Sequence, residues 1–135
     1  ARAASEAIRR ASDVQSRSQN ERIYDRVIRV FGKDHVARRS EIVGQHVAWD
    51  AHNVIMLPNR RRAIFEYMTN HTNSVSNKFM MFSDIRAADS SISLNTVVRS
   101  LDDLGEKAQM VGDVANIVPL KASDERYRRH CGPES

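Results

Sequence analysis

The stretch "SISLNTVVRSLDDLGEKAQMVGDVANIVPL", residues 91–120, decides the predicted fold. Ser93 is a natural N-cap, and Gly105 is a natural helix end. Between them an apolar stripe recurs at helical spacing, formed by Leu94, Val97, Val98, Leu101 and Leu104. Farther on, the apolar runs "AQMV" and "VANIVPL" flank Gly112 and Asp113, a pair typical of a tight turn. The stretch therefore predicts a capped helix followed directly by a β-hairpin.

The segments upstream of this stretch are predicted to be helical. "NERIYDRVIRVFG" begins at Asn20, a plausible N-cap, and ends at Gly32. "VARRSEIVGQHVAWDAHNVIM" offers a wide apolar face, and "NRRRAIFEYMTNH" restarts a helix after Pro58. The turn-rich loop "NHTNSVSN" separates it from a short helix within residues 78–89. The first two segments either pair two copies of the chain or fold back as an intramolecular helical hairpin.

The order of these elements predicts a mainly α fold with a small β-hairpin wing. It is that of a winged helix-turn-helix preceded by N-terminal helices. We divide the chain into a helical arm for dimerisation (1–56), the winged helix-turn-helix (57–121) and a C-terminal tail (122–135).

Four segments carry a resemblance to known regulators. "SISLNTVVRSLDDLGEKAQMV" resembles the recognition helix and first wing strand of MarR-type regulators, and "ISLNTVVRSLDDL" is also similar to the corresponding helix of ferric uptake (Fur) regulators. "LPNRRRAIFEYM" resembles their first helix, "MFSDIRAAD" the start of a MarR second helix, and "SDERYRR" the segment near the MarR wing. The likeness spans about residues 57–130. It implies a DNA-binding regulator.

Composition favours an anionic partner and a reducing compartment. The 135 residues hold 21 Lys and Arg against 17 Asp and Glu, a net charge of +4. The single cysteine, Cys131, cannot form an internal disulfide, and no apolar run approaches the roughly 18 residues of a membrane span. We therefore expect a cytoplasmic protein without a membrane anchor.

The function that these features favour is sequence-specific binding of double-stranded DNA by a homodimeric transcriptional regulator. One alternative is the DNA-binding module of a plasmid or phage replication or partition protein. Another is a winged helix that docks proteins, because residues 58–121 are nearly neutral in charge.

The candidate DNA-binding residues follow from the predicted recognition helix. Asn95, Thr96 and Arg99 lie near its N-terminus, where side chains read base edges. Phosphate contacts are assigned to nearby hydroxyl groups, to basic side chains and to the wing turn, at Ser91, Ser93, Ser100, Arg61, Lys78, Lys107 and Gly112. The alternative is that these are solvated residues of outer faces.

Catalytic and metal-binding patterns are absent from the sequence. It has no glycine-rich phosphate loop, no nucleophile elbow and no carboxylate pair in an acid–base context. The five histidines do not stand at ligand spacing with cysteine or carboxylates, and His130 and Cys131 have no counterpart of the Fur ligands beside them. The sequence thus predicts neither an enzyme nor a metal or other cofactor.

Overall fold

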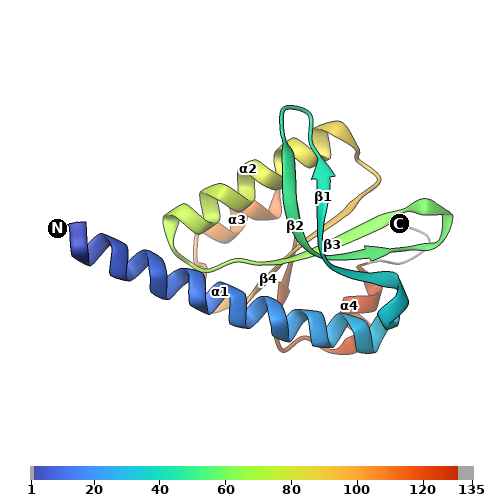
Figure 1. The fold of residues 1–135 in the computed structure, drawn as a ribbon, viewed down its shortest axis with the longest axis horizontal. Coiled ribbons are helices and arrows are strands. Elements are labelled where there is room, and N and C mark those ends of the chain that lie inside the picture. The colour runs from blue at the N-terminus through green and yellow to red at the C-terminus, as the bar shows by residue number, and fades with distance from the viewer. Residues whose placement is uncertain (1, 131–135) are drawn as a thin grey trace.

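The chain folds around a five-stranded mixed β-sheet with helices on both faces (Figure 1). This computed structural model describes residues 2–130, and for residues 2–16, 59, 103 and 108 it describes the backbone alone. The strands are β1 (Val36–Val43), β2 (Ala48–Met56), β3 (Arg62–Tyr67), β4 (Ser93–Val98) and β5 (Asn116–Pro119). The α-helices are α1 (Arg2–Phe31), α2 (Thr72–Ala88), α3 (Lys107–Gly112) and α4 (Asp124–Arg129). Short 3-10 helices occupy Lys33–His35, Pro58–Arg60 and Leu101–Asp103.

The strands lie in the sheet in the same order as in the chain. β1, β2 and β3 form an antiparallel meander, whereas β3, β4 and β5 run parallel. The parallel pairs need crossover connections, which α2 and α3 provide. This places the carboxyl ends of β3 and β4 at one edge of the sheet.

Two apolar cores lie on opposite faces of the sheet. α2 and α3 bury Phe82 and Val111 against one face. α1 and α4 bury Ile23 and Tyr127 against the other, where the Tyr127 ring stacks on Phe65 with centroids 5.4 Å apart. Because both faces of β3 and β4 are covered, every residue of these strands after the first is buried, polar residues included.

The prediction of a mainly α fold with a winged helix-turn-helix is wrong. Residues 93–98 form β4 in the interior of the sheet, not the first turns of an exposed helix. The adjacent β-branched residues Thr96, Val97 and Val98 favour a strand. Apolar spacing alone does not distinguish a short buried strand from a buried helix segment, so the helical stripe misled the assignment.

The predicted wing hairpin is also wrong. Residues 107–112 form α3, so Gly112 ends a helix and does not occupy a hairpin turn. The apolar run that follows pairs in parallel with β4, with Val118 opposite Val97. Burying this run beside a central strand hides more apolar surface than a solvent-exposed hairpin would.

Of the helices predicted upstream, some are present and others are strands. The helix predicted from Asn20 lies within α1, and the short helix before residue 89 lies within α2. Residues 36–56 instead form the β1–β2 hairpin, and residues 62–67 form β3. The predicted boundary at residue 56 thus falls in the connection between two strands of one sheet. Within residues 2–130, the structure contains no helix of the length and apolar character that crossing a membrane requires.

Candidate functional site between strands β2 and β3

Strands β2 and β3 separate partway along their length. Their backbone pairing extends from Met56 opposite Arg62 to Val54 opposite Ile64. Continuing the same register would place His52 opposite Glu66, but there side chains replace the backbone ladder. The Glu66 carboxylate accepts a hydrogen bond from the backbone N–H of His52. Polar groups therefore fill the interior gap between the two strands.

Asn53 marks the point where the strands part. Its φ of 52° lies in the left-handed region, which asparagine tolerates better than most residues. Its buried side chain donates a hydrogen bond to the Phe65 carbonyl at 3.1 Å. This backbone turn in β2 directs His52 toward β3, where it meets Glu66.

Glu66 is the buried centre of the site. Its side chain is 0% exposed, and Lys78 Nζ lies 3.0 Å from Oε1. Lys78 follows Val75 and precedes Phe82 at the spacing of one helix face, so α2 presents it to the sheet with these core residues. His52 Nδ1 lies 3.2 Å from both carboxylate oxygens. Two potentially cationic groups from different elements thus share one carboxylate.

Contacts with Lys78 and His52 keep Glu66 ionised. Burial raises the pKa of Glu66, but Lys78 and His52 oppose burial, and the pKa lies below its ordinary value of 4.5. An ionised carboxylate only accepts hydrogen bonds, so His52 Nδ1 carries a proton and donates it. In neutral His52, Nε2 then has a free lone pair. Nε2 has no hydrogen-bond partner among the side chains and backbone groups that the structure describes.

A second ion pair extends the cluster toward solvent. Asp50 precedes His52 by two residues in β2 and forms an ion pair with Arg39 of β1. The Arg39 hydrogen bond lowers the pKa of Asp50, and His52 contributes in the same direction. We call Arg39, Asp50, His52, Glu66 and Lys78 the β2–β3 cluster.

The β2–β3 cluster has the composition of an acid–base site. The side chains of His52 and Lys78 are 30% and 22% exposed, so both reach solvent while Glu66 does not. A buried carboxylate that orients a histidine leaves the outer ring nitrogen available as a general base. Lys78 and Arg39 bring positive charge to the same cluster, each paired with a carboxylate. Perturbed titratable groups with specific charge partners are typical of functional sites.

Two of the three residues predicted to read bases are buried, whereas the third, Arg99, is exposed. Asn95 is fully buried in β4, where its Nδ2 donates to the Ile64 carbonyl at 3.1 Å and its Oδ1 accepts from Asn116 at 2.9 Å. Thr96 is fully buried beside it. Neither side chain is accessible to DNA in this structure, because both lie inside the sheet.

Most of the other predicted residues contact the protein's own chain. The Ser91 hydroxyl donates to Asp89 at 2.6 Å, and the Ser93 hydroxyl donates to the His130 carbonyl at 2.6 Å. Arg61 is half-buried beyond the 3-10 helix at Pro58–Arg60, and Gly112 is exposed at the end of α3. These four positions do not lie in one surface element.

Three predicted residues lie around a cavity at the carboxyl ends of β3 and β4. Arg99 and Ser100 line this cavity of about 230 Å³. Lys107 Nζ donates to the Asn70 carbonyl in its wall at 3.1 Å. Lys78 instead belongs to the β2–β3 cluster.

Sequence reasoning missed His52 and Glu66. The available signal was a single acidic residue inside the apolar run "AIFEYM", because a charge in a buried strand requires a partner. No three His, Cys, Asp or Glu side chains in the described part of the chain are arranged to hold a metal ion. No protein-family model, curated protein or solved structure matches this chain.

Proposed function

We propose that the chain hydrolyses phosphodiester bonds in nucleic acid, with the β2–β3 cluster as its active site. The observation that carries this proposal is the buried, ionised Glu66 shared between Lys78 and the solvent-accessible His52. If Glu66 had only a structural role, one cation such as Lys78 would be enough to compensate its buried charge. The histidine held on the same carboxylate adds a base whose outer nitrogen is free for chemistry.

Nucleic acid, including the duplex DNA expected from the sequence, is the substrate class that the charges favour. The chain carries a net charge of +4. Lys78 and Arg39 bring positive charge to the cluster, where a phosphate would approach. We place the protein in the cytoplasm, where it would meet this substrate.

In the proposed reaction, His52 Nε2 takes a proton from a water molecule as the water oxygen attacks phosphorus. The new P–O bond forms while the P–O bond to the leaving sugar oxygen breaks, and that oxygen takes a proton from solvent. Glu66 stabilises the imidazolium through Nδ1. Lys78 offsets the negative charge that develops on the phosphoryl oxygens. The products are a phosphomonoester and an alcohol.

A cleavage assay tests the proposal on labelled duplex DNA, single-stranded DNA and RNA. Each substrate is incubated with Mg²⁺ and with a chelator, because Mg²⁺ assists phosphoryl transfer in many enzymes. We expect His52→Gln to lower the cleavage rate at least about 100-fold, because a general base usually contributes a factor of this size. His35→Gln, which alters an exposed histidine, serves as the matched control.

The outcomes separate catalysis from binding. Absence of cleavage on every substrate, or a His52→Gln variant as active as His35→Gln, would contradict the hydrolase. Duplex binding that weakens steeply with salt but occurs without cleavage would support DNA binding alone. Circular dichroism of both variants shows whether each remains folded.

A further inference from the structure

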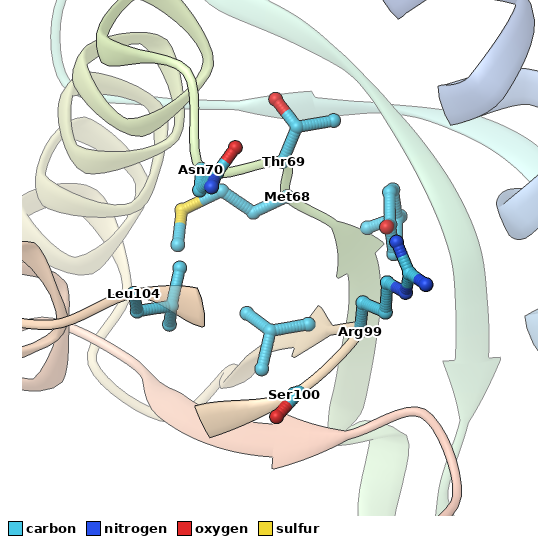
Figure 2. Close-up of a pocket in the computed structure, with 8 residues that line it drawn as sticks. Met68, Thr69, Asn70, Arg99, Ser100 and Leu104 are labelled. Atoms are coloured by element: carbon cyan, nitrogen blue, oxygen red, sulfur yellow. The ribbon is translucent and has the colours of Figure 1, made fainter. Parts of the chain in front are cut away.

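The cavity that Arg99 and Ser100 line is separate from the β2–β3 cluster. It opens where the parallel strands β3 and β4 end, and Figure 2 shows its lining side chains arranged around a central space. Met68 and Leu104 are buried apolar residues of its lining, whereas Thr69 and Asn70 are polar. Open sheets commonly bind ligands in the crevice outside the carboxyl ends of parallel strands. The location is therefore one where a ligand is expected.

Arg99 gives the cavity an available positive charge. Its side chain is exposed, and within residues 2–130 the guanidinium makes no ion pair or hydrogen bond with a described side chain or backbone group. Arginine presents a planar array of donors that matches an oxyanion with two parallel hydrogen bonds. None of the residues lining the cavity is acidic. Nothing in the lining therefore competes with an anion for Arg99.

Two hydroxyl groups lie on opposite sides of the cavity lining (Figure 2). Ser100 Oγ accepts a hydrogen bond from the Asp102 backbone N–H at 3.2 Å. Thr69 Oγ1 accepts one from the His71 backbone N–H at 3.4 Å. Because each oxygen already accepts from the backbone, its own O–H remains to be donated. These hydroxyl groups make the lining polar, and Arg99 is the one positively charged residue among the lining residues.

We propose that this cavity binds a single phosphate group. Its volume of about 230 Å³ is below the roughly 300–1,000 Å³ of sites for larger organic ligands. It therefore has room for a phosphate group and little room for a larger organic ligand. Lys107, which bonds to the cavity wall at Asn70 and to Thr72 Oγ1, adds positive charge nearby. The phosphate is free inorganic phosphate or the terminal phosphate of a nucleic-acid strand, and its binding does not depend on the proposed hydrolysis.

Isothermal titration calorimetry tests this site on the full chain. The probes are inorganic phosphate, a 5′-phosphorylated oligonucleotide and the same oligonucleotide without its phosphate. We expect Arg99→Gln to weaken phosphate binding at least about tenfold, as loss of a charge-assisted hydrogen bond does. Arg99→Lys retains the charge but not the planar donors, so its affinity for phosphate should lie between those of Arg99→Gln and the wild type.

Arg22→Gln is the matched control, because it removes an exposed arginine of α1 far from the lining residues in sequence. If the chain binds the phosphorylated oligonucleotide more tightly than the unphosphorylated one, and inorganic phosphate abolishes this difference, the ligand is the terminal phosphate of a strand. Binding of inorganic phosphate without that preference identifies free phosphate. No binding by either phosphate probe, or equal effects of Arg99→Gln and Arg22→Gln, would overturn the site.

The test also distinguishes this site from the hydrolase. His52→Gln should bind phosphate as the wild type does, because His52 does not line the cavity. Failure of the cavity to bind phosphate while His52→Gln still loses cleavage would overturn this inference only.

Discussion

Asparagine side chains satisfy backbone groups of the central strand β3 from both sides. Asn53 of β2 donates to the Phe65 carbonyl, and Asn95 of β4 donates to the Ile64 carbonyl. Both asparagines are nearly or fully buried, where an unpaired amide would be costly. Their polarity at these positions is therefore structural, although the sequence alone favoured a DNA-reading role for Asn95.

Thr96 differs because its buried hydroxyl lacks a partner in the described part of the chain. Thr96→Val keeps the β-branched shape and removes the unpaired hydroxyl, so we expect the free energy of unfolding to rise by about 1 kcal/mol. Urea denaturation measures this change. Thr69→Val is the control and should destabilise, because its hydroxyl accepts the His71 N–H. An equal decrease in the free energy of unfolding of both variants would contradict the conclusion that the Thr96 hydroxyl is unpaired.

At the scale of elements, Asp84 of α2 fixes the tip of the β1–β2 hairpin. Its carboxylate accepts from the His46 and Val47 backbone N–H groups at 2.9 and 3.2 Å, and from Trp49 Nε1 at 2.8 Å. Burial raises the pKa of Asp84, but these hydrogen bonds oppose it and the pKa lies below the ordinary 3.8. One side chain thus joins an antiparallel hairpin to a helix on the sheet face.

The hairpin tip leaves no room for a side chain at Gly44. A Cβ at this position would overlap the Asp84 carboxylate and crowd the Val47 carbonyl. We expect Gly44→Ala to destabilise the fold by about 1–3 kcal/mol, as overpacking usually does, and to speed hydrogen exchange of the His46 and Val47 amides. Gly112→Ala is the control, because its nearest contact would be an ordinary 3.6 Å from Ile117. Unchanged exchange at both amides would contradict the role of Asp84.

The sequence correctly predicted helices that bury only one face, because their apolar residues recur at a regular spacing. α1 and α2 keep polar residues opposite their buried positions, so the helical spacing near Ile23 and Phe82 was informative. β3 and β4 are covered on both faces, which removes the two-residue alternation that identifies a strand. The Glu66–His52 contact depends on strand register across 14 positions, which no local pattern encodes.

At the scale of the whole molecule, ionised carboxylates connect parts that are distant in the chain. Glu66 joins the sheet to α2, and Asp84 joins α2 to the β1–β2 hairpin. Asp124 of α4 pairs with Arg29 and Arg26 of α1, and the Arg29 hydrogen bond lowers its pKa. Protonating these groups weakens contacts between elements as well as contacts within them.

We expect the free energy of unfolding to fall as the pH is lowered from 6 to 3. The folded pKa values of Glu66, Asp84 and Asp124 lie below their ordinary values of 4.5, 3.8 and 3.8. Their stabilisation is therefore complete above those ordinary values and is lost as the pH falls through the folded values. Urea denaturation at several pH values measures the slope, which Asp84→Asn should reduce. A pH-independent free energy over this range would contradict the expectation.

The matching order of strands in the chain and in the sheet bears on how the protein is made. Each strand pairs with its immediate predecessor, so the sheet can be assembled from β1 to β5 as the ribosome releases the polypeptide, without waiting for a distant segment. The exception is α1, whose Arg26 meets the Tyr127 ring of α4. α1 precedes all five strands in the chain, yet it acquires this neighbour only when translation has passed residue 127.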